Sequence, residues 1–102
     1  MIKSLFLVFR NPGPAWVPEL PSRQQPHWDE HAAFMDRLFE QGRIVLGGPY
    51  TDHSRVLLVV QARDRKEASE LFRDDPWTTH GILVESEINE WSIFLDSRQN
   101  RD

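Results

Sequence analysis

Two unbroken apolar runs constrain the fold of this chain more than any other feature. Residues 5–9 and 56–60 each hold five consecutive apolar side chains, a pattern that favours strands and is too short for a buried helix. A strand that is apolar at every position is covered on both faces. We therefore predict strands over residues 2–9, ending at a turn over residues 10–13, and over residues 55–61. We expect both faces of each strand to be buried.

An amphipathic helix is predicted between these strands. Apolar residues recur there at helical spacing, which gives a helix one buried stripe. They are Trp28, Ala32, Met35, Leu38 and Phe39. Pro26 suits the first helical turn, where its missing N–H is not needed, and Gly42 suits the left-handed position that ends a helix. Residues 44–46 then predict a second strand, and we expect Gly47-Gly48-Pro49 to form a sharp turn after it.

A second helix and a fourth strand complete the pattern. Asp64 with Glu67 three residues later is typical of a capping box, so we expect a helix from residue 65. We expect it to end at Asp75-Pro76, because the residue before proline avoids the helical conformation. After a short connection over residues 77–80, residues 82–95 alternate in part between apolar and polar and predict a strand.

The resulting order is β-α-β-β-α-β, which is typical of the ferredoxin-like α+β fold. This fold has a four-stranded antiparallel sheet with both helices on one face, and it leaves the other face of the sheet uncovered. Because two strands are apolar on both faces, a monomer would expose a large apolar patch. We predict one α+β domain over residues 1–96, a polar tail over residues 97–102, and a homodimer in which the two sheets pack face to face.

Composition narrows the possible partners. The chain has 102 residues and a formal net charge of −4, with basic and acidic residues intermixed. It therefore offers no basic stripe for nucleic acid, and no apolar run approaches the roughly 20 residues that a membrane helix needs. The absence of cysteine excludes disulfides and Cys-ligated metals and fits a reducing cytoplasm. We expect a cytoplasmic protein without nucleic-acid or membrane partners.

A proline-rich segment follows the first strand. Residues 11–26 hold five of the seven prolines, and proline removes a backbone donor, so no helix or sheet is expected there. Segments of this length in small domains are usually lids, binding loops or flexible linkers. Trp16 favours an ordered loop, which we interpret as a lid, and a flexible connection is the alternative.

His27 and His31 lie four residues apart, so on a helix they share a face. Residues 27–31 also match the H-x-x-E-H pattern of some zinc proteases. The match covers five residues only, the domain is too small for that protease architecture, and no third ligand is placed by the sequence. We expect neither a metal nor a cofactor.

His31 and Asp75 are the best candidates for chemistry. His31 lies one helical turn from Trp28 and from Met35, at the border of the buried stripe. Histidine takes up and releases a proton near neutral pH, so we consider it a proton-transfer group; a hydrogen-bonded core histidine is the alternative. Asp74 and Asp75 at a helix C-terminus would oppose the helix dipole, which suggests another role for one of them, with a helix-ending turn as the alternative. A carboxylate beside an imidazole fixes its tautomer and stabilises the imidazolium.

An aromatic pocket around this pair is the third expectation. Its candidate lining residues share either an aromatic ring or a place in the Gly-Pro segment. They are Trp16, Trp28, Gly48, Pro49, Tyr50 and Trp77. Packing in the core or at an interface is the alternative for each aromatic residue. His53 and His80 fall in predicted loops and are expected at the surface.

Three stretches of the chain resemble a known family. WDEHAAFMDRLFEQGRIVLGGP, LLVVQARDRKEASELFRDDPW and EINEW are similar to the YciI-like (YCII-related) family over roughly residues 2–96. The family markers match His31, Gly48-Pro49 and Asp75-Pro76 in order and spacing. The resemblance implies a dimeric α+β barrel and an active-site pair formed by His31 and Asp75. The long loop over residues 11–26 departs from the shortest members.

The resemblance also implies a class of chemistry. One member is a dehydrochlorinase that acts on a chlorinated hydroxyquinone, and the muconolactone isomerases have a similar fold, so both indicate proton transfer on small ring compounds. Fold likeness alone does not assign function. We therefore expect a small cofactor-independent enzyme of lyase or isomerase type acting on a cyclic metabolite. A non-catalytic module that binds a small molecule or a protein is the alternative.

Overall fold

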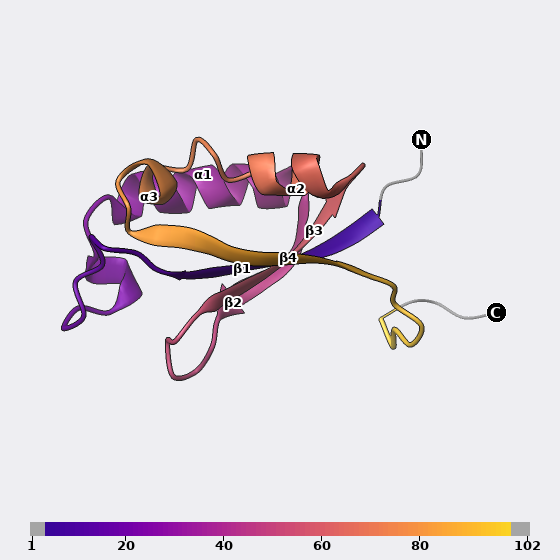
Figure 1. The fold of residues 1–102 in the computed structure, drawn as a ribbon, viewed down its shortest axis with the longest axis horizontal. Coiled ribbons are helices and arrows are strands. Elements are labelled where there is room, and N and C mark those ends of the chain that lie inside the picture. The colour runs from indigo at the N-terminus through magenta and orange to yellow at the C-terminus, as the bar shows by residue number, and fades with distance from the viewer. Residues whose placement is uncertain (1–3, 99–102) are drawn as a thin grey trace.

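The computed structural model describes residues 4–98 and has four strands, three α-helices and one 3-10 helix in that range (Figure 1). In chain order they are β1 (Ser4–Pro12), η1 (Ser22–Gln24), α1 (Trp28–Glu40), β2 (Ile44–Pro49), β3 (Val56–Ala62), α2 (Arg65–Glu70), α3 (Pro76–Thr79) and β4 (Leu83–Trp91). The strands form one antiparallel sheet in the order β2-β3-β1-β4. The predicted α+β ferredoxin-like class is confirmed. Residues 2 and 3 of the predicted first strand and residues 99–102 of the predicted tail lie outside the described residues.

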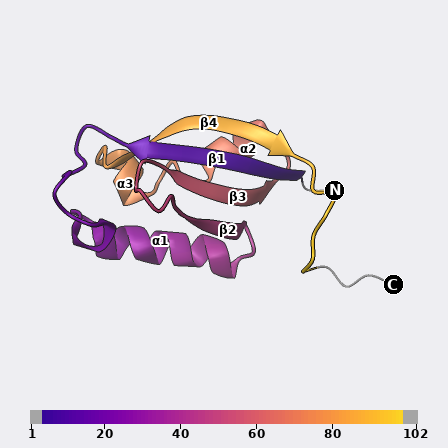
Figure 2. The ribbon, with the colours of Figure 1, turned by 90° about the horizontal axis from the view of Figure 1, so that it is seen from below.

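The hydrophobic core lies between the sheet and the three α-helices, all of which cover the same face (Figure 1). On the central strand β1, Phe6 and Val8 are buried against this layer, as are Val60 of β3 and Ile88 of β4. Helix α1 lies along the β2 edge of the sheet (Figure 2). Among the described residues, no helix has the length and apolar character needed to cross a membrane.

Strand β1 continues past the turn that the sequence predicts at residues 10–13. Asn11 and Pro12 pair with Val84 and Leu83 of β4, so the predicted end at residue 9 is wrong. Proline is tolerated here because the pairing with β3 ends at Arg10, so Pro12 has a neighbouring strand on one side only, as in an edge strand. The extension places Arg10 inside the sheet instead of in a turn.

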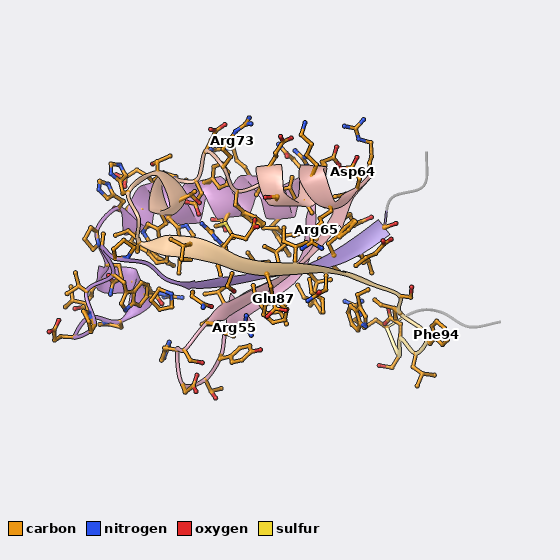
Figure 3. The ribbon with its side chains drawn as sticks, viewed as in Figure 1. Arg55, Asp64, Arg65, Arg73, Glu87 and Phe94 are labelled. Carbon is orange, nitrogen blue, oxygen red and sulfur yellow. The ribbon has the colours of Figure 1, made fainter. Side chains whose placement is uncertain are left out.

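The other face of the sheet is left open by the described chain. Leu5, Leu7 and Phe9 of β1 point there and are only half-buried. The guanidinium of Arg55 lies 4.1 Å from the centre of the Phe9 ring and is 3.0 Å from a carboxylate oxygen of Glu87, and Figure 3 shows this ion pair on the side away from the helices. In one chain, therefore, β1 is not buried on both faces.

The end of α1 agrees with the prediction. Gly42 has φ +75°, the left-handed conformation that glycine adopts without strain. The N–H of Gly42 donates to the carbonyl of Phe39 at 3.0 Å, and the N–H of Arg43 donates to that of Leu38 at 2.9 Å. These two bonds form a Schellman motif. They turn the chain from α1 directly into β2.

The second predicted helix is shorter than expected, and a further short helix lies where a connection over residues 77–80 was predicted. Asp64 caps α2 as predicted, accepting a hydrogen bond from the N–H of Glu67 at 2.8 Å. Helix α2 ends at Glu70, however, and Pro76 is the first residue of α3, with Asp75 as its N-cap. The prediction that Asp75-Pro76 ends a helix is wrong, because proline at the first helical position begins a helix as readily as it stops one.

The predicted turn after the second strand is also wrong. Gly47, Gly48 and Pro49 belong to β2 and pair with residues 56–58 of β3. A Cβ atom on Gly47 would lie 2.6 Å from a methyl carbon of Leu58, so glycine leaves room for the Leu58 side chain at this point. Strand β4 is shorter than predicted and ends at Trp91 instead of residue 95.

Candidate active site

Asp75 lies at the centre of a buried polar cluster that joins three distant segments. We call the group formed by Arg10, His31 and Asp75 the Asp75 cluster. Asp75 is 0% exposed, and one oxygen of its carboxylate accepts the N–H of Trp77 at 3.0 Å. An aspartate at the N-cap followed by proline is a strongly preferred start for a helix. The Asp-Pro sequence thus fixes the carboxylate locally, before any contact with distant residues.

His31 approaches Asp75 from the first turns of α1. Its Nδ1 atom lies 2.9 Å and 3.0 Å from the two carboxylate oxygens of Asp75, and the residue is 7% exposed. An ionised carboxylate only accepts hydrogen bonds, so Nδ1 carries the proton. In neutral His31, Nε2 is therefore the nitrogen with a free lone pair, and it has no hydrogen-bond partner among residues 4–98.

Arg10 completes the cluster from β1. Its Nη1 atom donates to Asp75 at 2.8 Å, its Nη2 atom donates to the hydroxyl of Thr78, and its guanidinium lies 5.2 Å from the centre of the Phe72 ring. At 1% exposure, this is a buried ion pair. Arg10 was not among the residues predicted for the site. The available signal was its spacing, since every second residue of β1 points to the core and Arg10 follows Phe6 and Val8 at that interval.

The cluster keeps Asp75 ionised. Burial alone would raise the pKa of Asp75, but the hydrogen bonds from His31 and Arg10 outweigh it and hold the pKa below its ordinary value. Burial lowers the pKa of Arg10, and the contact with Asp75 opposes this change. Arginine stays protonated in proteins throughout the neutral range. Asp75 is consequently a fixed negative charge between one permanent cation and one imidazole.

Aromatic rings hold the imidazole in place. The ring of Trp77 is stacked on that of His31 with centroids 3.8 Å apart and planes inclined by 4°. The Nε1–H group of Trp77 donates to the carbonyl of Pro26 at 2.8 Å, which fixes the indole. Trp28 lies 5.7 Å from His31 and 5.6 Å from Trp77.

A cavity of about 750 Å³ opens beside the cluster. It is bounded by α1, η1, β2 and the helix-covered face of the sheet. Most of the side chains around it are apolar, including Met35, Phe39, Ile44, Val56 and Leu58. His31 and Arg10 reach it from the cluster, and Arg23 and His53 reach it from the two neighbouring loops. A largely apolar cavity with few polar groups is the usual form of a small-molecule site.

The structure brings four of the six predicted lining residues to this cavity. They are Trp28, Trp77, Gly48 and Pro49. Trp16 does not line it and packs edge-on against Trp77, with centroids 5.8 Å apart. Tyr50 lies outside it, is 40% exposed, and has its ring 5.9 Å from the guanidinium of Arg55. His53, which the sequence places at the surface, is exposed and also borders the cavity.

His27 and His31 do not point at a common atom. The ring of His27 is stacked on that of His80 with centroids 3.9 Å apart, whereas His31 binds Asp75. Within residues 4–98, no group of three or more His, Cys, Asp or Glu side chains is placed to hold a metal ion. Within the described chain, the Asp75 cluster offers acid–base chemistry through Nε2 of His31.

Comparisons with known proteins show a family match over most of the described chain. The profile of the YCII-related domain matches residues 4–92. The uncharacterised protein YjpA of Bacillus subtilis is 33% identical over 69 residues, which cover 68% of this chain and 80% of YjpA.

A solved structure shares the fold. It is 5-chloro-2-hydroxyhydroquinone dehydrochlorinase (TftG) from Burkholderia phenoliruptrix, in complex with 2,5-dihydroxybenzoquinone. The TM-score is 0.59 at 24% identity, and the match covers 86% of this chain and 93% of TftG. TftG has the dimeric α+β barrel fold. Because the family profile spans nearly the whole described chain, this protein belongs to the YCII-related family.

Proposed function

We propose that this protein is a cofactor-independent enzyme that moves a proton on a small ring compound, in a reaction of lyase or isomerase type. The observation that carries the proposal is the contact of 2.9 Å between Nδ1 of His31 and the fully buried carboxylate of Asp75, at the wall of an apolar cavity. An imidazole that is oriented by a carboxylate and borders a ligand-sized cavity is the arrangement that general acid–base catalysis requires.

In the proposed reaction, Nε2 of His31 removes a proton from a carbon or oxygen of the bound ring. The electron pair left behind either accepts a proton at another ring position or expels a leaving group, which gives an isomerase or a lyase. Asp75 stabilises the imidazolium without taking the proton itself, because Arg10 helps to hold its pKa low. A positioned base of this kind contributes about 10²–10⁴-fold to the rate.

The chemistry of TftG supports a ring substrate. TftG is a dehydrochlorinase and was solved with a dihydroxybenzoquinone, and the cavity described here has aromatic and apolar walls at Trp28, Trp77 and Phe39. A volume of about 750 Å³ falls within the roughly 300–1,000 Å³ typical of small-molecule pockets. We therefore propose hydroxylated single-ring compounds as the first substrates to test.

The decisive assay follows turnover by wild type and by His31→Gln. Chloride release from 5-chloro-2-hydroxyhydroquinone and isomerisation of small lactones are measured with saturating compound. We expect His31→Gln to lower kcat by at least about 100-fold while the fold is retained. His80→Gln, at an exposed residue outside the cavity lining, is the matched control and should keep full activity. Equal activity in wild type and His31→Gln would contradict the proposal, and binding without turnover in wild type would favour a non-catalytic binding module.

We also propose that the protein forms a homodimer through the open face of the sheet. The support is the half-buried apolar row Leu5, Leu7 and Phe9 on the face of the sheet that no α-helix of the described chain covers, where the guanidinium of Arg55 lies over Phe9. Large exposed apolar patches are rare in soluble monomers. Light scattering at micromolar concentration should give twice the chain mass for wild type and one chain mass for Leu7→Glu. Lys66→Glu on the helix side is the control, and a monomeric wild type would refute the dimer.

A further inference from the structure

One wall of the cavity comes from residues 13–26, the segment between β1 and α1 at the end of the molecule where α3 lies (Figure 1). Its first residues are tied to the chain before β4, since the N–H of Gly13 donates to Ile82 at 2.8 Å and that of Ala15 donates to Gly81 at 3.0 Å. Its last residue, Pro26, accepts the indole N–H of Trp77 at 2.8 Å. Both ends of the wall are therefore fixed by hydrogen bonds that involve its own backbone groups.

In the middle of the wall, the side chain of Gln25 adds to short-range backbone hydrogen bonds such as that from the N–H of Leu20 to the carbonyl of Val17. Gln25 is 3% exposed and uses its whole amide on the backbone of the same segment. Its Oε1 atom accepts the N–H of Val17 at 2.9 Å, and its Nε2 atom donates to the carbonyls of Val17 at 2.7 Å and Leu20 at 2.8 Å. Prolines in this segment cannot donate backbone hydrogen bonds, so the amide replaces the pairing that a strand or helix would supply.

The part of the wall that faces the cavity is directly next to Gln25. Residues 21–24, which include η1, line the cavity, and the N–H of Gln25 donates to Ser22 at 3.1 Å. The Gln25 amide also binds the backbone of Val17, which directly follows Trp16. Trp16 packs against Trp77, and the ring of Trp77 is stacked on that of His31. Gln25 therefore connects the cavity wall to the ring that orients the proposed base.

We propose that Gln25 is a positioning residue that fixes this wall in its closed place before a ligand arrives. The segment then acts as a permanent wall and not as a lid that opens and closes. A ring ligand meets a preformed site and does not lose affinity by having to order the segment. The proposal rests on the proposed function for the class of ligand, but the state of the wall is measurable without any ligand.

The first test is hydrogen exchange on ligand-free protein. Gln25→Ala removes all three hydrogen bonds, and Gln25→Glu places a carboxylate against two carbonyl oxygens. In both variants we expect amide exchange over residues 16–25 to be at least about tenfold faster, with the sheet unchanged. Gln61→Ala removes another glutamine bond to the backbone, from Nε2 to the carbonyl of Gly42 at 2.9 Å, and should leave the wall unaffected. Unchanged exchange over residues 16–25 in Gln25→Ala would overturn the proposal.

The second test measures binding of 2,5-dihydroxybenzoquinone by titration calorimetry. If the wall is closed about one tenth of the time in Gln25→Ala, the apparent Kd rises about tenfold, and saturating compound restores slow exchange over residues 16–25. In wild type the compound should leave that exchange unchanged. A merely structural role would leave the Kd of the folded protein unchanged, and that result would overturn the positioning role.

The two proposals fail in different ways. If wild type turns over a ring compound, Gln25→Ala should raise KM and leave kcat unchanged, whereas His31→Gln lowers kcat. Loss of kcat in Gln25→Ala with unchanged KM would contradict the positioning role alone. If wild type binds no ring compound, the ligand class of the proposed function and the binding role of Gln25 are both overturned.

Discussion

Replacing Asp75 with asparagine should destabilise this protein more than any substitution at an exposed ion pair. Asparagine keeps the shape of the side chain and one hydrogen-bond acceptor oxygen, so the N–H of Trp77 can still donate to it. The negative charge is lost, however, and an NH₂ group faces either Arg10 or His31, which are both donors. Arg10 is then a buried charge without its counterion. Removing one partner of a buried pair costs about 3–5 kcal/mol.

This loss is large for a chain of this size. Domains are stable by about 5–15 kcal/mol in total, so Asp75→Asn should remove about a fifth or more of the free energy of unfolding. At about 4–8 °C per kcal/mol for a domain near 100 residues, the melting temperature should fall by roughly 12 °C or more. Urea unfolding followed by tryptophan fluorescence and by circular dichroism measures the free-energy change. Lys66→Met, at an exposed pair of 3.6 Å with Glu70, should stay within about 0.5 kcal/mol.

The partners of Asp75 provide the internal check. Arg10→Met alone leaves the carboxylate with His31, which can carry the compensating positive charge, so we expect a smaller loss of about 2 kcal/mol. The double variant, Arg10→Met with Asp75→Asn, removes both charges and should be more stable than Asp75→Asn by about 1 kcal/mol or more. A loss below about 1 kcal/mol for Asp75→Asn, or a double variant no more stable than Asp75→Asn, would refute this reasoning.

Three further predictions concern acid stability and local structure. Because the folded pKa of Asp75 is lowered, its stabilising contribution is present above the unfolded pKa of about 3.9 and is lost as the pH falls through the folded pKa. The difference in unfolding free energy between wild type and Asp75→Asn should therefore shrink below about pH 4. Gly42→Ala should cost about 1–2 kcal/mol because φ is +75°, whereas Gly48→Ala, where a Cβ meets nothing within 4 Å, should change stability by less than about 0.5 kcal/mol by urea unfolding. Trp77→Phe keeps an aromatic ring but loses the bond to Pro26 and part of the buried ring surface, and should cost about 1 kcal/mol or more in the same assay.

The elements whose signals are local could be predicted from the sequence. Gly42 ends α1 and Asp64 begins α2 because a left-handed glycine and a side-chain cap act within a few residues. The order of strands and main helices was predicted from the spacing of apolar residues along the chain, which is also a short-range property. The alternation of residues between the two faces of a strand is also local, but the sheet register is not, because it shifts between Phe9 and Arg10 where β1 pairs with β4.

The features that depend on distant partners could not be predicted in the same way. Arg10 lies beside a proline-glycine turn signal, and its pairing with Val56 of β3 and Glu85 of β4, both more than 40 residues later, keeps it in a strand. Helix α3 is four residues long and too short to show a period. His31 and Asp75 were paired through the family resemblance, since nothing local links residues 44 positions apart. Gln25 carries no pattern at all, because a glutamine amide becomes structural only when the loop around it has closed.

The central claim is that His31 offers an unprotonated Nε2 to the cavity while Nδ1–H is held by Asp75. Long-range ¹⁵N–¹H correlation spectra of ¹⁵N-histidine-labelled protein measure the tautomer directly, and His31→Gln assigns the signal. Above the pH at which the imidazolium of His31 loses its proton, the account predicts a protonated Nδ1 and a bare Nε2 in wild type, with the preference weakened in Asp75→Asn. A neutral His31 with the proton on Nε2 in wild type would contradict the proposed base and the mechanism built on it.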